Sequence, residues 1–136
     1  MAEIRLHDDE MTTREIAVRG EHLRRQVLGD AYVDASKGQV DTLSAPLQDL
    51  ITRYCWGEIW ARPGLDMRTR SFLNLAMMAA LGRPEELVLH TRGAIRNGIT
   101  EEEIAEVIAQ AAIYCGVPAA LDALRAVRHA LKSEVG

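Results

Sequence analysis

Residues 66–82 carry a run of apolar side chains that leaves almost no polar face. The apolar residues of this run include Phe72, Leu73, Leu75, Ala76, Met77, Met78, Ala79 and Ala80. Asp66 can cap the start of a helix and Gly82 can stop it, so the pattern predicts one helix between them. A helix that is apolar nearly all round lies at the centre of a bundle or of an assembly. Either subunits bury this helix together, or one domain wraps it alone.

Helical spacing and breaker residues divide most of the remaining chain into further helices. The predicted segments are 12–28, 44 to either 57 or about 60, 84–97, 100–116 and a last helix from Pro118. No segment alternates at period two, so we expect an all-α bundle of about six helices. At 136 residues the chain is expected to be a single domain, 1–136, that buries its core without a metal or disulfide.

Three local features of the first half carry further expectations. Residues 1–12 are polar and expected to be flexible, and residues 30–43 are expected to form a loop or a short turn of helix. Ser44 is expected to cap the helix that follows it. The helical face formed by Leu47, Leu50, Ile51, Tyr54 and Cys55 is predicted to be buried.

Composition excludes several classes of function. The net charge is −4 and no basic stripe occurs, so a nucleic-acid partner is not expected. No window of 18 apolar residues predicts a membrane span, and the N-terminal residues lack the apolar core of a signal peptide. We therefore expect a cytoplasmic protein. Cys55 and Cys115 are sixty positions apart without metal-ligand spacing, and both are expected to be buried free thiols.

The stretch 54–64 gathers polar and aromatic groups at a helix end. Trp56 and Trp60 share one helical face and fit either core packing or the wall of a ligand slot. Glu58 between them fits a surface carboxylate, a partly desolvated one with a raised proton affinity, or one that orients an imidazole. Arg62, directly before a Pro-Gly break, is either solvated or holds a carboxylate in a two-pronged grip.

Two more polar positions lie downstream in apolar surroundings. His90 fits either a satisfied core residue or a group that exchanges a proton near neutral pH. Arg68 and Arg70 both lie near the start of the apolar helix. Of the two, Arg70 is the better candidate for a buried cation. If Glu58, Arg62 and His90 converge, the chain is a small enzyme acting on an anionic molecule. No phosphate loop, nucleophile elbow or HExxH occurs, so we expect a reaction without cofactor or metal, or no reaction.

Several blocks of the sequence together resemble the carboxymuconolactone decarboxylase family. These blocks are residues 54–66, 68–71, 79–86, 98–104 and 112–120, together with His90, and residues 24–30 resemble its N-terminal portion. The resemblance covers roughly residues 20 to 130. The block Trp-Gly-Glu-Ile-Trp is specific for the decarboxylase branch, whereas Gly-x-Thr-Glu-Glu-Glu-Ile is shared across the superfamily.

The resemblance implies an AhpD-like helical fold assembled as a ring-like homo-oligomer, a hexamer. It implies cofactor-free decarboxylation of 4-carboxymuconolactone, a small anionic lactone, in the β-ketoadipate pathway of protocatechuate breakdown. On this reading His90 and Glu58 are catalytic, and Arg62 and Arg70 bind the carboxylates of the substrate. The indoles of Trp56 and Trp60 then exclude water from the pocket.

Two other functions are open alternatives. A thiol-dependent hydroperoxide reductase of the redox branch needs two closely spaced cysteines. The cysteine positions of that branch fall on Arg83 and Glu86 here, and its upstream acid falls on Ser71. The other alternative is a non-catalytic oligomeric binding module that keeps the fold without the chemistry.

Overall fold

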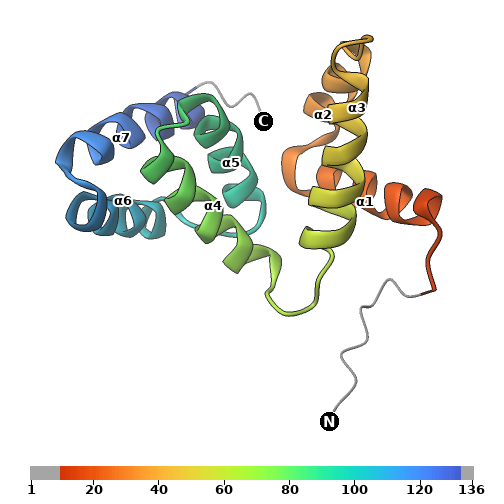
Figure 1. The fold of residues 1–136 in the computed structure, drawn as a ribbon. Helices are drawn as coiled ribbons and strands as arrows, with labels where there is room; N and C mark the ends of the chain where they lie inside the picture. Colours follow the sequence, from red (N-terminus) through yellow and green to blue (C-terminus); the bar gives the residue numbers. More distant parts are fainter. Residues whose placement is uncertain (1–9, 133–136) are drawn as a thin grey trace. The chain divides into compact units, whose positions relative to one another are not determined.

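The computed structural model describes residues 10–132, which fold into helices joined by short turns (Figure 1). No strand occurs within this range, so the expected all-α class is confirmed. The elements are α1 (Thr13–Leu28), α2 (Asp30–Gly38), α3 (Ala45–Leu50), η1 (Ile51–Trp60), α4 (Met67–Leu81), α5 (Pro84–Arg96), α6 (Glu101–Cys115) and α7 (Val117–Lys132). The expectation for residues 1–9 lies outside the described residues.

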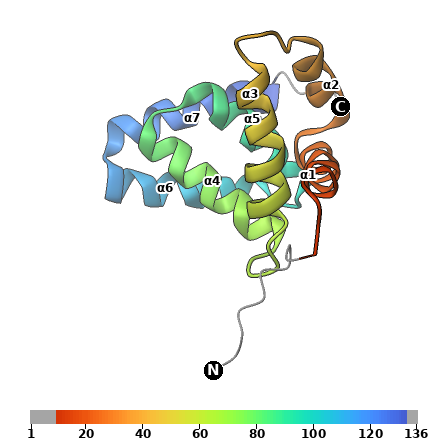
Figure 2. The same ribbon diagram turned by 45° about the vertical axis from the view of Figure 1, so that its right-hand side comes forward.

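The chain divides into two compact units, the first ending at Leu65 and the second beginning at Asp66. The first unit contains α1, α2, α3 and the π-helical segment η1, and the second contains α4 to α7 (Figures 1 and 2). The single domain over 1–136 stays a prediction, because the compactness of a unit does not show that it folds alone. None of the described helices has the length and apolarity needed to span a membrane.

In the first unit, α1 packs against η1 through two glycines. A Cβ atom on Gly20 would lie 1.9 Å from the carbonyl oxygen of Thr52, and one on Gly57 would lie 2.5 Å from that of Ile16. Arg19 adds to this crossing, because its Nε donates a hydrogen bond of 3.0 Å to the carbonyl oxygen of Gly57. The two backbones therefore meet at a distance that no side chain permits.

Residues 30–43 were expected to form a loop or a short turn of helix. This is wrong for the first nine of them, which form the helix α2. The amide of Val33 donates to the carbonyl oxygen of Gly29, and the Val33 side chain is fully buried. Packing of α2 against α1 supplies the stability that the weak local pattern does not show. A helix of this kind is missed when only periodicity is read.

Two expectations for α3 and η1 are also wrong. The Ser44 side chain makes no cap hydrogen bond to α3, because its Oγ accepts from the amide of Asp41 at 3.0 Å. The face predicted to be buried is exposed at Leu47, Leu50 and Tyr54, whose exposed fractions are 56%, 50% and 56%. Helical spacing identified this apolar stripe, but no described element of the first unit covers it at these three residues.

In the second unit, α4 to α7 surround a core that includes Leu75, Leu87, Ile99, Ile104 and Val127. The predicted caps are confirmed. The Asp66 carboxylate accepts from the amide of Thr69 at 2.7 Å, Gly82 ends α4 with a φ of 67°, and Thr100 forms a reciprocal capping box with Glu103. These helix ends are set by residues that are close in sequence.

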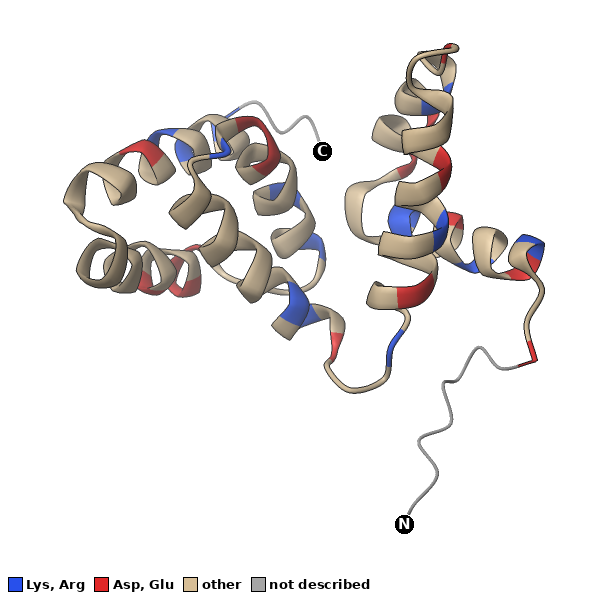
Figure 3. Cartoon of the chain, viewed as in Figure 1, with Lys and Arg blue, Asp and Glu red and all other residues tan. Residues whose placement is uncertain are grey.

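The helix α4 keeps an exposed apolar face. Figure 3 shows no charged residue in α4 beyond its first turn. Its core side holds Leu75 and Ala79, whereas Leu73, Met77 and Leu81 are 45%, 47% and 61% exposed. Within the second unit, α5, α6 and α7 therefore leave this face of α4 uncovered.

Candidate functional site

The two tryptophans of the first unit form a stacked pair on η1. Their ring centroids are 4.5 Å apart with an angle of 24° between the planes, so the predicted shared face is confirmed. Trp56 and Trp60 are 3% and 4% exposed. Ten residues of π-helix hold the pair, and π-helical segments frequently occur at functional sites.

The other two candidate residues of the first unit have different surroundings. Glu58 is half-buried on η1, and its charge contributes to raising the pKa of Arg53, after the larger effect of Asp49. Arg62 is exposed beyond the end of η1, where its amide donates to the carbonyl oxygen of Ile59. One short segment therefore presents a carboxylate, a guanidinium and two indoles.

In the second unit, His90 on α5 faces the polar side of α4. The Nδ2 atom of Asn74 lies 3.4 Å from Nδ1 of His90. Arg70 lies one helical turn before Asn74, and therefore on the same side of α4. The structure thus brings an amide and an imidazole together at the contact between α4 and α5, with Arg70 on the same side of α4.

Burial sets the protonation state of His90. It lowers the pKa of the imidazole below its ordinary value of 6.5, while the nearby charge of Glu86 acts in the opposite direction. His90 is therefore neutral at pH 7. An amide nitrogen can only donate, so the contact with Asn74 favours the tautomer in which Nδ1 of His90 accepts and Nε2 carries the proton. In that tautomer Nε2 is a hydrogen-bond donor.

Asn74 was missed from the sequence, and Ser71 was named there only as the position of the acid of the redox branch. Asn74 is the one polar residue between Ser71 and Gly82, and a polar side chain in such a run was the available signal. Ser71 is 1% exposed and accepts from Nδ2 of Asn97 at 2.8 Å, and the same nitrogen donates to the carbonyl oxygen of Met67. These bonds fix the start of α4 against the end of α5.

The candidate residues thus fall into two groups. Trp56, Glu58, Trp60 and Arg62 belong to the first unit, and Arg70 and His90 belong to the second. Each group is gathered within its own unit. The convergence of Glu58 and Arg62 with His90 stays a prediction, because these residues belong to different units.

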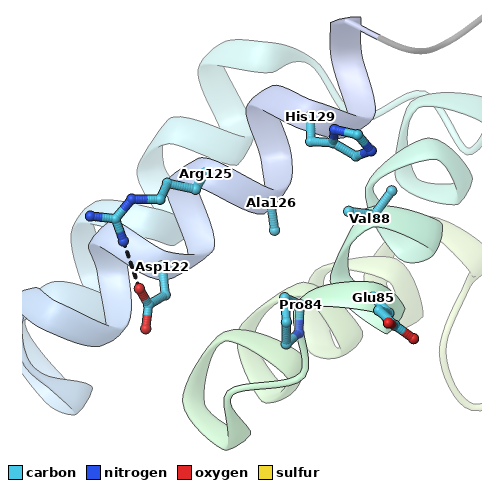
Figure 4. A pocket seen from close by; sticks show the side chains of 7 residues that line it. All are labelled: Pro84, Glu85, Val88, Asp122, Arg125, Ala126 and His129. Atoms are coloured by element: carbon cyan, nitrogen blue, oxygen red, sulfur yellow. Dashed lines mark hydrogen bonds and ion pairs between the residues drawn. The ribbon is translucent and has the colours of Figure 1, made fainter.

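Two cavities of the second unit are lined by other residues. One of about 500 Å³ lies between the start of α5 and α7, where Figure 4 shows Val88 and His129 facing each other. Arg125 at its edge is paired with Asp122 at 2.6 Å, so its charge is already balanced. The other cavity, of about 350 Å³, lies between α4 and α6 beside Phe72 and Tyr114. Neither includes Arg70 or His90.

The two cysteines differ in burial, although both were expected to be buried. Cys115 is exposed, so its predicted burial is wrong: it is the last residue of α6, directly before the turn at Gly116. Cys55 is half-buried, and burial raises the pKa of its thiol. Cys55 lies in the first unit and Cys115 in the second. Within residues 10–132, no group of three His, Cys, Asp or Glu side chains is arranged to hold a metal ion.

Comparison with known proteins shows that this chain is similar to decarboxylases over most of its length. Residues 45–129 match the carboxymuconolactone decarboxylase family. The chain is 43% identical over 111 residues to the nitrosuccinic acid decarboxylase of Metarhizium robertsii, covering 82% of this chain and 78% of that protein. It is 37% identical over 114 residues to the 4-carboxymuconolactone decarboxylase of Acinetobacter baylyi, covering 84% and 85%. These matches support a decarboxylase.

Proposed function

Because the chain belongs to the carboxymuconolactone decarboxylase family, we propose that it decarboxylates a small dicarboxylic acid without a cofactor. The observation that carries this proposal is the similarity to two decarboxylases over more than four fifths of the chain. The names of both relatives describe acids in which a strongly electron-withdrawing group accompanies the carboxylates. Such a group can take up the electrons that carbon dioxide leaves behind, so the substrate itself provides the electron sink.

We propose 4-carboxymuconolactone as the first substrate to test. When the bond between its ring carbon and the carboxylate breaks, the electron pair moves through the ring double bond to the lactone carbonyl. An enolate forms, and a proton that comes ultimately from water then adds to a ring carbon. The protein has to hold the two carboxylates, stabilise the enolate oxygen and admit the proton.

The described residues are suited to these tasks. Neutral His90, with its proton on Nε2, donates a hydrogen bond to the enolate oxygen, and Asn74 keeps the imidazole in that tautomer. Arg62 and Arg70 bind the carboxylates. Glu58 lies against the departing carboxylate, where repulsion between like charges favours loss of carbon dioxide. The stacked pair of Trp56 and Trp60 forms an apolar wall of the pocket.

Nitrosuccinic acid is the second candidate substrate, because the relative named for it shares the higher identity, 43%. Its nitro group replaces the lactone carbonyl as the electron sink, and its two carboxylates make the same demand on the arginines. The two candidates differ in shape, since one is a ring and the other an open chain. Comparing carbon dioxide release from the two acids under identical conditions, without added cofactor, tests the proposal and selects between them.

The resemblance further supports a homo-oligomer of the ring-like, hexameric kind. The exposed residues Leu73, Met77 and Leu81 of α4 are suited to be buried by a second copy, which agrees with the apolar character of the whole helix. We further propose that the reaction belongs to the β-ketoadipate pathway and takes place in the cytoplasm. Sedimentation velocity gives the number of subunits directly.

The activity should fall as the pH is lowered through the depressed pKa of His90. Above pH 6.5 the imidazole is neutral and kcat/KM should be flat. Below its pKa an imidazolium forms, pairs with the carboxylate that must leave and stabilises the ground state. Asn74→Asp places a carboxylate beside Nδ1 and should raise the pKa of His90. The fall of kcat/KM on the acid side of the pH profile, its acid limb, should then move to higher pH.

The measurement is kcat/KM from pH 5 to 8 for the wild type and Asn74→Asp. The carboxylates of the substrate stay ionised over most of this range, so their protonation does not account for a fall in kcat/KM at low pH. A rate that rises on acidification would make imidazolium the active form. An acid limb at the same pH in both proteins would assign it to a group other than His90.

A further inference from the structure

Arg24 of α1 is a buried cation that meets no carboxylate within the described part of the chain. It is 5% exposed. Its Nη1 donates to Oε1 of Gln48 at 3.2 Å, and its Nη2 donates to Oγ of Ser36 at 3.3 Å. The guanidinium also lies 5.9 Å from the ring centroid of Tyr32. All three partners are neutral, and its buried Nε has no hydrogen-bond partner among the described residues.

The next residue in the chain shows how unusual this is. Arg25 is less buried than Arg24, yet it pairs with Asp34 at 2.7 Å, Asp30 at 3.1 Å and Glu21 at 3.4 Å. Burying a charge is costly unless the charge is paired, so the more buried arginine is the one expected to have an acidic partner. Here the less buried arginine, Arg25, has the acidic partners, and the more buried Arg24 has neutral ones. The fold places Arg24 where a negative charge is required and supplies none from residues 10–132.

A cavity of about 250 Å³ in the first unit includes Arg24 in its lining. The other charged residues of the lining are already compensated. Lys37 pairs with Glu21 at 2.6 Å, and Asp49 pairs with Arg53 at 2.8 Å. Arg24 is thus the one basic residue of the lining that has no acidic partner among the described residues, and the amide of Gln48 lies beside it.

We propose that this cavity binds the carboxylate of a small organic acid, with Arg24 as its anchor. A guanidinium presents N–H groups in a fork that matches the two oxygens of a carboxylate, and a bound carboxylate supplies the acidic partner that Arg24 lacks among the described residues. A phosphate dianion suits it less well, because Glu21 and Asp49 also line the wall. The volume lies below that of pockets for drug-sized ligands and fits an acid of a few carbons.

This site is additional to the proposed decarboxylase site and does not rest on it. The lining of the cavity contains none of Trp56, Glu58, Trp60, Arg62, Arg70 or His90. Arg24 would remain a buried cation without an acidic partner even if the chain had no decarboxylase activity. Binding at this site is therefore measured with acetate, which contains a carboxylate but cannot act as the proposed substrate.

The test is thermal unfolding of the full chain with increasing sodium acetate, compared with sodium chloride at equal ionic strength. We expect a rise of about 3–6 °C at acetate concentrations ten times Kd, which grows further with the logarithm of the acetate concentration. Arg24→Gln should weaken acetate binding at least tenfold. Arg25→Gln removes the same charge from the neighbouring position outside the cavity, and it should leave Kd within about twofold.

A second variant keeps the test decisive if Arg24→Gln does not fold. Gln48→Glu places a carboxylate beside Nη1 of Arg24, so it should raise the melting temperature in chloride and abolish the response to acetate. The proposal is overturned if acetate acts no differently from chloride on the wild type, or equally on all variants. It is also overturned if acetate has no effect while Gln48→Glu reduces concentration-dependent self-association in sedimentation, since an acidic side chain of a second copy then fills the cavity.

Discussion

Replacing His90 by alanine should lower kcat for decarboxylation by about 10²–10³-fold while leaving the fold intact. That range is the usual effect of removing one donor to a developing oxyanion. His90 is held at the contact between α4 and α5 by Asn74, and burial keeps it neutral at pH 7. His90→Gln should recover part of the lost rate, because its amide N–H₂ group also donates hydrogen bonds.

The matched control is His129→Ala. His129 is an exposed histidine on α7 that lines the cavity shown in Figure 4, and we give it no catalytic role. Its loss should change kcat by less than about twofold. Circular dichroism and melting temperature of each variant separate lost chemistry from lost folding. A large loss in His129→Ala with normal activity in His90→Ala would move the active site to the cavity between α5 and α7.

Gly20→Ala should destabilise the protein by about 3 kcal/mol or more. The added Cβ atom would lie 1.9 Å from the carbonyl oxygen of Thr52 and 2.8 Å from the amide nitrogen of Gly57. Both contacts are with backbone, which cannot rotate away as a side chain can, and overpacking of this kind costs about 1–3 kcal/mol or more. Intrinsic helix propensity alone would favour alanine by about 1 kcal/mol, so destabilisation identifies the clash.

Gly38→Ala is the control for this prediction. Gly38 ends α2 in open space, without a positive φ, so alanine should be neutral or slightly stabilising there. Urea unfolding of the two variants and the wild type gives the free energies of unfolding. If Gly20→Ala were as stable as the wild type, α1 and η1 would not be in direct backbone contact. The same contact explains the glycine between Trp56 and Glu58, because Gly57 lies against α1.

Features set by neighbouring residues could be predicted from the sequence. The Asp66 cap and the capping box of Thr100 and Glu103 each join residues three positions apart, so their geometry follows from the local pattern. The stacking of Trp56 on Trp60 likewise joins residues four positions apart on one element. The family resemblance rested on the block containing these tryptophans, and the family match covers it.

Features set by distant residues could not be predicted. α2 forms because Val33 packs in the interior. Asn74 and His90 are sixteen positions apart in the sequence and lie on two different helices, so their contact is not a local feature. Arg24 reads as an ordinary helix arginine until its burial and its neutral partners are known. The exposure of Leu47 and Leu50 was missed for the same reason, since periodicity identifies an apolar face but not what covers it.

Carbon dioxide release from 4-carboxymuconolactone by the purified chain, without added cofactor and with a metal chelator present, tests the central claim most directly. We expect one carbon dioxide for each lactone consumed by the wild type, and a rate lower by about 10²–10³-fold for His90→Ala. Nitrosuccinic acid is assayed in parallel. Release of carbon dioxide from neither acid, when calorimetry shows that both bind, would contradict this account and make the chain a binding protein that keeps the fold of a decarboxylase.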